Sequence, residues 1–231
     1  MPGSPARLSQ YPPGMAPSPP SARTAVRRLP ERGAYDRATA DAILDEGLVA
    51  HVGLGTEHGP VVIPLLYARD GDRVLLHGSP AAGLLRGGKK GASLCLTVTL
   101  LDGLVLARSA FHHSVNYRSV VVFGTATPLA DLDDKRAALD VLVQHVVPGR
   151  IGGTRPPSDK ELQSTLVLAL PLDEFSVKVR TGDPKDEPDD MDLPYWAGVV
   201  PLATVPGAPI TATDLRVDAP VPAYAAAYTR P

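Results

Sequence analysis

The chain has 231 residues, of which 44% are hydrophobic, and carries a formal net charge of −2 at pH 7. This length suits one domain with tails, and the near-neutral charge gives no electrostatic reason to expect a nucleic-acid or membrane-surface partner. The single cysteine, Cys95, excludes an internal disulfide and fits a reducing compartment.

Both ends of the chain are rich in proline and small residues. Residues 1–30 and 201–231 therefore predict disordered or loosely attached tails on a domain that spans 31–200. No window approaches the roughly 18–20 uninterrupted apolar residues that a membrane span requires. Because the N-terminus also lacks the apolar segment of a signal peptide, we expect a cytoplasmic protein.

The first predicted elements are a helix, which Asp36 caps and Gly47 ends, and three strands. The strands are predicted over 48–54, 61–68 and 73–77. Pro64 lies inside the second strand and has no N–H for a ladder hydrogen bond. It therefore marks an edge, a bulge or a place where the strand opens and lets neighbouring amides face a planar ligand.

The junction after the strand 73–77 suits an anion. His77, Gly78 and Ser79 end the strand, and a short helix is predicted over 80–90. A helix N-terminus presents free amides and a partial positive charge, which Arg86, Lys89 and Lys90 would reinforce. An ordinary N-cap at Ser79 with solvated cations explains the same residues equally well.

The rest of the chain predicts more strands and one long helix. Strands are predicted over 93–100 and 103–109, around a tight turn at Leu101-Asp102-Gly103, and again over 164–170 and 175–180. Between them, 109–126 joins a polar loop to an apolar strand, and a helix follows over 131–147. The acidic run 183–192 predicts a solvated linker. Successive hairpins favour a mainly β fold, a small antiparallel barrel with two or three peripheral helices.

Local catalytic and metal motifs are missing from the sequence. It contains no P-loop, nucleophile elbow, HExxH or spaced Cys/His framework, and a hydrolase using Ser79 or Ser109 lacks a local signature. His112 and His113 are adjacent, so in an extended backbone they point to opposite faces and do not readily chelate one metal. No metal site is predicted.

The segments VVIPLLYARDGDRVLLHGS, NYRSVVVFGTA and SVKVRTG, in this order, resemble the FMN-binding split-barrel proteins related to pyridoxamine 5′-phosphate oxidase. Within that family they are most similar to the branch related to nitroimidazole-resistance proteins. The resemblance covers roughly residues 30–200. It implies a split β-barrel that is usually a homodimer, with FMN bound at the subunit interface.

The resemblance also implies which residues line the flavin. These are Ile63, Pro64, Leu65, Tyr67, His77, Gly78, Ser79, Arg86, Tyr117, Arg118, Ser119 and Val120. The strand with Pro64 would lie along the isoalloxazine ring, and His77 matches an active-site histidine of the nitroimidazole-resistance relatives. Relatives often carry a basic residue where this chain has Gly83, which leaves Arg86, Lys89, Lys90 or Arg118 to neutralise the phosphate.

The implied activity is the oxidation or reduction of a small organic molecule by hydride transfer with FMN, and NADH or NADPH would be the donor. Three alternatives remain open. The chain could hold a flavin without turnover, or bind a deazaflavin. It could instead be a haem-binding split barrel in which His77, His112 or His113 is the axial ligand.

Overall fold

The computed structural model describes residues 18–78 and 91–229, which form two compact units. The first unit holds the chain up to Gly47 together with Leu96–Phe123 and Asp173–Thr204. The second holds Leu48–Cys95, Gly124–Leu172 and the chain from Val205 onwards. The pairs β1–β8, β2–β3, β3–β4, β4–β7, β5–β9, β6–β7 and β6–β8 are antiparallel.

The first unit is built on long strands. Its elements are η1 (Pro30–Arg32), β1 (Gly33–Ala34), α1 (Arg37–Glu46), β5 (Ala92–Leu106), η3 (Ala110–His112), β6 (Ser114–Pro128), β8 (Glu174–Arg180), η4 (Pro188–Asp190) and β9 (Gly198–Pro201), with β5 and β6 continuing into the second unit. In this unit the strand order is β1-β8-β6-β5-β9. The predicted helix α1 is confirmed, since Asp36 accepts a hydrogen bond from the Thr39 amide at 2.9 Å and Gly47 follows its last turn.

The predicted turn at Leu101-Asp102-Gly103 is wrong. β5 runs through these residues as one strand, and Gly103 pairs with Pro201 of β9. A Cβ at Gly103 would stand 3.0 Å from Val199 Cγ1 and 3.1 Å from the Val200 carbonyl oxygen. The glycine therefore allows a close approach of β9, a partner almost a hundred residues away along the sequence.

The acidic run 183–192 is more than a solvated linker. The Asp186 carboxylate accepts hydrogen bonds from the amides of Arg108 and Ser109, at 2.9 and 3.3 Å, and pairs with the Arg108 guanidinium. Its side chain is only 1% exposed. This run is thereby fastened to the loop that follows β5.

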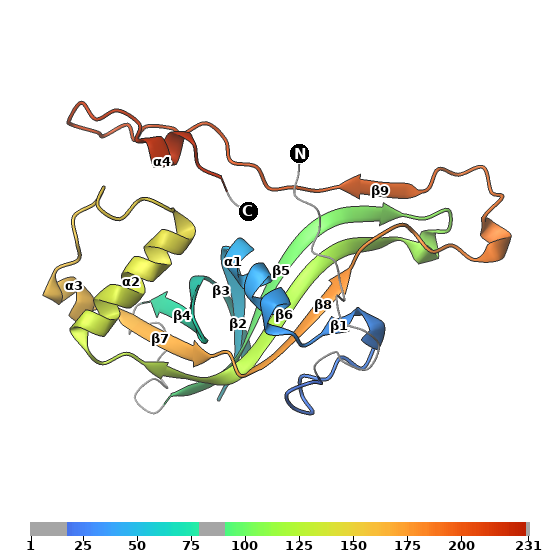
Figure 1. The fold of residues 1–231 in the computed structure, drawn as a ribbon, viewed down its shortest axis with the longest axis horizontal. Helices are drawn as coiled ribbons and strands as arrows, with labels where there is room; N and C mark the ends of the chain where they lie inside the picture. Colours follow the sequence, from blue (N-terminus) through green and yellow to red (C-terminus); the bar gives the residue numbers. More distant parts are fainter. Residues whose placement is uncertain (1–17, 79–90, 230–231) are drawn as a thin grey trace. The chain divides into compact units, whose positions relative to one another are not determined.

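The second unit packs one helix against a sheet (Figure 1). Its elements are β2 (Val49–Thr56), β3 (Gly59–Asp70), β4 (Arg73–Gly78), α2 (Leu132–Val146), α3 (Asp159–Gln163), β7 (Leu166–Pro171) and α4 (Ala223–Ala226), with the end of β6. The strand order is β6-β7-β4-β3-β2. The apolar side of the predicted helix α2 lies on β3, β4 and β7, where Leu142 and Ala138 meet Leu75 and Val167 in the core.

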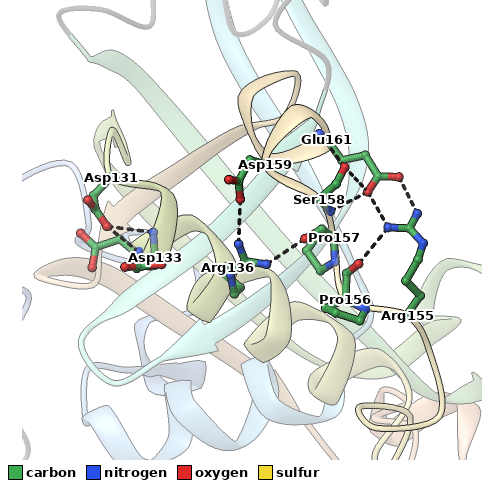
Figure 2. Close-up of polar contacts among 10 residues, drawn as sticks. Asp131, Asp133, Arg136, Arg155, Pro156, Pro157, Ser158, Asp159 and Glu161 are labelled. Carbon is green, nitrogen blue, oxygen red and sulfur yellow. Dashed lines mark hydrogen bonds and ion pairs between the residues drawn. The ribbon is translucent and has the colours of Figure 1, made fainter.

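The sequence did not predict α3, which polar contacts stabilise (Figure 2). Ser158 and Glu161 form a capping box, and Arg155 donates two hydrogen bonds to the Glu161 carboxylate at 2.7 and 2.9 Å. These contacts hold the pKa of Glu161 well below its ordinary value. Arg136 of α2 donates to the Pro157 carbonyl at 2.8 Å and so ties the two helices together.

Both predicted tails make contacts in their described parts. Thr24 is buried in the first unit. In the second unit, the Tyr224 ring lies against Gly149 and below the Arg150 guanidinium, and the Tyr228 hydroxyl donates to the Val146 carbonyl at 2.7 Å. The predicted boundaries at 30 and 201 stay predictions. In the described part of the chain no helix has both the length and the apolar character needed to span a membrane.

We expect Asp186→Ala to lower the melting temperature by about 3–6 °C, because the partly buried Arg108 and Ser109 amides would lose their acceptor. Asp189→Ala, in the same acidic run but exposed, is the matched control and should leave the melting temperature within about 1 °C. Equal melting temperatures for the two variants in calorimetry would contradict the fastening role of Asp186.

Candidate functional site

In the second unit, β3 separates from β4 part-way along its length. The β3–β4 ladder runs from Asp70↔Arg73 to Tyr67↔Leu76, and in the described part of the chain no pair continues it. Beyond this point the partner of β3 among the described residues is β2, over Gly59–Leu66, while His77 and Gly78 pair with β7. Alternate backbone N–H and C=O groups of the free stretch of β3 therefore point to an open edge. Of the three possibilities that Pro64 left open, an edge, a bulge or an opening of the strand, this arrangement matches the opening.

Tyr67 occupies the last rung before the opening. Its side chain is fully buried and packs on the His145 ring of α2, with the ring centroids 5.3 Å apart. The Tyr67 side chain therefore belongs to the core, and only its backbone could face a ligand.

One face of the β2–β3 hairpin is apolar and exposed. Pro64 lies opposite His51, and the flanking pairs are Val49↔Leu66 and Gly53↔Val62. Val62 is 64% exposed and Leu66 43%. The side chains of Ile63 and Leu65 project to the opposite, half-buried face. Of the predicted ring-binding residues, Pro64 therefore lies on the exposed apolar face between Val62 and Leu66, whereas Ile63 and Leu65 lie on the other face of the strand.

His77 lies on β4 just past the opening. Its side chain is half-buried, and burial lowers its pKa below the ordinary value. Among the residues that the structure describes, the imidazole has no hydrogen-bond partner. The lowered pKa favours the neutral ring, in which one nitrogen carries a lone pair that can accept a hydrogen bond or bind a metal. The predicted residues Ser79 and Arg86, and the predicted helix 80–90, lie outside the described residues.

The predicted residues Tyr117, Arg118, Ser119 and Val120 belong to the first unit, on β6. Their side chains alternate between two faces. Arg118 and Val120 share the buried face with Val177 and Val179 of β8, whereas Tyr117 and Ser119 lie on the other face, opposite Arg180 and Lys178. Only half of this predicted set can therefore contact any one ligand through side chains.

Arg118 is held by two carboxylates. Its Nε and one terminal nitrogen donate to Asp102 at 3.0 and 2.8 Å, and both terminal nitrogens donate to Glu46. Hydrogen bonds to Glu46 and then Asp102 raise the pKa of Arg118, so its charge persists at any working pH. Two negative charges on one guanidinium leave little attraction for a phosphate. A phosphate contact at Arg118 stays a prediction that competes with this arrangement.

The other two candidate histidines have partners. The Nδ1 atom of His113 accepts a hydrogen bond from the Ala107 amide at 3.0 Å, so a neutral His113 ring carries its proton on Nε2. The Nε2 atom of His112 lies 3.7 Å from the Glu187 carboxylate. Within the described residues no group of three or more His, Cys, Asp or Glu side chains is placed to hold a metal ion. Of the three candidate histidines, His77 is thus the one without a partner among the described residues.

The sequence reasoning missed Lys178 and Arg180. Both lie on β8 on the face that carries Tyr117 and Ser119, and the Ser119 hydroxyl donates to the Lys178 carbonyl at 3.3 Å. The alternation of apolar and basic residues in FSVKVR could have identified them, because a strand with that pattern presents its cations on one face.

A family model described as pyridoxamine 5′-phosphate oxidase matches residues 36–179. The chain belongs to this pyridoxamine 5′-phosphate oxidase family. The predicted mainly antiparallel split-barrel fold is thereby confirmed, and the parting of β3 from β4 is consistent with it. No curated protein sequence was found to match the chain.

Solved structures include close relatives within the pyridoxamine 5′-phosphate oxidase family. The flavocytochrome Anf3 from Azotobacter vinelandii is 40% identical, with a TM-score of 0.85 over 90% of this chain and 97% of its own. An FAD- and haem-binding protein from Mycobacterium smegmatis is also 40% identical, with a TM-score of 0.79 over 84% and 95%. A nitroimidazole antibiotic resistance protein from Bacteroides thetaiotaomicron, 24% identical with a TM-score of 0.53 over 64% and 86%, shares the fold.

We expect Arg118→Ala to lower the free energy of unfolding by about 1–3 kcal/mol, because Glu46 and Asp102 would be left without their partly buried counter-charge. Chemical denaturation measures this change, and a flavin titration on the same variant separates the two roles. Unaltered stability together with weakened flavin binding would show that Arg118 serves a phosphate instead.

Proposed function

We propose that this chain binds a flavin and haem and acts as a redox protein that transfers electrons or hydride. The observation that carries this proposal is the opened edge of β3 beside a neutral, half-buried histidine at the end of β4. The flavocytochrome and the FAD- and haem-binding protein, each 40% identical to this chain, support the same pair of cofactors.

The apolar surface around Pro64 fits a flat aromatic ring. It offers side chains that need no hydrogen bonds, and the open edge of β3 supplies backbone donors and acceptors for ring heteroatoms. A bound flavin would supply hydride and single-electron transfer by itself, so the chain needs only to bind, orient and shield it. We propose FMN or FAD as the flavin, and a deazaflavin is the alternative that analysis of the released cofactor would distinguish.

The sequence left haem open as an alternative to a flavin. We propose that the chain binds both. A haem iron requires a neutral imidazole, and His77 provides one because burial disfavours its protonated form. The Nδ1 atom of His113 is already an acceptor, and the His112 ring faces a carboxylate. We therefore propose His77 as the axial ligand, in place of the active-site role that the resemblance implied for it.

The reaction that we propose is the oxidation or reduction of a small organic molecule or another small acceptor, with NADH or NADPH as the donor. The sequence carries no P-loop, nucleophile elbow or HExxH motif that would indicate phosphoryl transfer or hydrolysis. A redox reaction fits this arrangement because the cofactors carry the reactive groups.

The absorbance spectrum of untreated, purified protein tests the two cofactors together. We expect flavin bands and a haem Soret band, and we expect NADH or NADPH to reduce the flavin under anaerobic conditions. His77→Ala should lose the Soret band and keep the flavin bands, whereas the control His58→Ala, an exposed hairpin residue, should keep both. A spectrum without flavin would refute the proposed function, and a haem band that survives in His77→Ala would refute the ligand.

We also propose that the chain is a homodimer. The exposed side chains of Val49, Val62 and Leu66 form an apolar strip on the β2–β3 hairpin that a second copy would cover. Light scattering at micromolar concentration should give twice the mass of the 24.3 kDa chain, and Val62→Lys should shift it towards the monomer. A wild-type mass of one chain would exclude the dimer.

A further inference from the structure

A cluster of basic and hydroxyl side chains lies on one face of β6 and β8 in the first unit. Tyr117 and Ser119 of β6 pair in register with Arg180 and Lys178 of β8, so their side chains point to the same side of the sheet. Arg32 ends η1, directly before Gly33, which pairs with Lys178. The charge of Arg32 acts on the Arg180 guanidinium. This cluster, Arg32, Tyr117, Ser119, Lys178 and Arg180, is called the basic face below.

Arg180 is a buried cation without a counter-charge. The residue is only 6% exposed, and its guanidinium donates to the Asn116 side-chain oxygen and to the carbonyls of Gly182 and Asp183. All these acceptors are neutral, and within the described residues Arg180 makes no ion pair and its Nε has no acceptor. A guanidinium held only by neutral oxygens lacks a counter-charge, and an anion that reached its Nε would supply one through a charge-assisted hydrogen bond.

The neighbouring cations strengthen the positive potential at this place. Burial, and after it the charge of Arg32, lowers the pKa of Arg180. The Lys178 ammonium donates to the Arg28 carbonyl at 2.9 Å, which is again a neutral acceptor. In the part of the chain that the structure describes, no carboxylate pairs with Arg32 or Lys178.

Two other arginines of the same unit are neutralised by carboxylates of the chain itself. Arg118, one position from Tyr117, is paired with both Glu46 and Asp102. Arg23 lies over the Phe123 ring, at the far end of the same face, and pairs with Glu174. The basic face differs from both because, among the described residues, no carboxylate pairs with its cations.

We propose that the basic face binds a phosphoryl group of a nucleotide cofactor. Guanidinium groups and a lysine ammonium recognise phosphate oxygens through charge-assisted hydrogen bonds, and the Tyr117 hydroxyl can donate another. The molecule that carries this phosphate is a flavin nucleotide or a nicotinamide nucleotide. The choice of these two classes rests on the proposed redox function. The phosphate site itself does not, because it can be tested with pyrophosphate alone.

The first experiment uses inorganic pyrophosphate as the probe on the full chain at constant ionic strength. Thermal unfolding should show stabilisation of the wild-type protein that rises with pyrophosphate concentration, because a ligand that binds only the folded state raises the melting temperature. Arg32→Gln and Lys178→Gln should each lose most of this shift. These positions are preferred to Arg180, whose guanidinium also holds the turn at Gly182 and Asp183.

The matched control is Arg23→Gln, which removes the same charge from the same face at a place where Glu174 already neutralises it. It should respond to pyrophosphate as the wild-type protein does. If pyrophosphate fails to stabilise the wild-type protein, or stabilises all four proteins equally, the proposal is overturned.

A second experiment identifies whether a flavin nucleotide or a nicotinamide nucleotide carries the bound phosphate. After removal of bound cofactor, Lys178→Gln should weaken FMN or FAD binding about tenfold to hundredfold and leave riboflavin, which has no phosphate, unchanged. If flavin affinities are unchanged and NADPH binding weakens instead, the site belongs to the nicotinamide nucleotide. Equal losses for FMN and riboflavin would overturn the phosphate role. If the wild-type protein binds no flavin, the proposed function fails, and the pyrophosphate result still decides this site.

Discussion

The parting of β3 from β4 is the constraint on which the candidate site depends. The Tyr67↔Leu76 pair is the last pair of the β3–β4 ladder. The position of this pair is fixed because the buried Tyr67 ring packs on His145 of α2. A side chain of this size cannot leave the core without opening a large cavity. The core therefore fixes where the sheet opens, and the open edge with Pro64 and His77 follows from that position.

Strand alternation divides the basic residues of the first unit into two groups. Arg118 points to the buried face of β6, where its charge requires carboxylates, and Glu46 and Asp102 supply them. Arg180 and Lys178 point to the other face, where their acceptors are neutral oxygens. Arg118 and Arg180, on paired strands, thus differ in charge compensation: Arg118 has two counter-charges and Arg180 has none among the described residues. A cation that the protein neutralises stabilises the fold, whereas one without a counter-charge favours an anionic ligand.

The elements that local signals define could be predicted from the sequence. Asp36 and Gly47 bound α1, the apolar spacing of 139–146 marks α2, and Pro64 indicated the opening of β3. The failures involve residues whose partners are distant in sequence. Gly103 was predicted to lie in a turn because its pairing with β9 is not visible in the local sequence. Asp186 was predicted to be solvated because its hydrogen-bond donors, Arg108 and Ser109, are far away along the chain. A local pattern does not contain that information.

The same long-range contacts make Arg180 a rigid group. Its guanidinium and the Asn116 amide both donate to the Gly182 carbonyl, so the turn after β8 is tied to the start of β6. A few residues later, Asp186 fastens the chain to the end of β5. A side chain held in this way has little rotamer entropy left to lose when a ligand binds. Because the hydrogen bonds that fix the guanidinium all go to neutral oxygens, they orient the charge and leave it uncompensated.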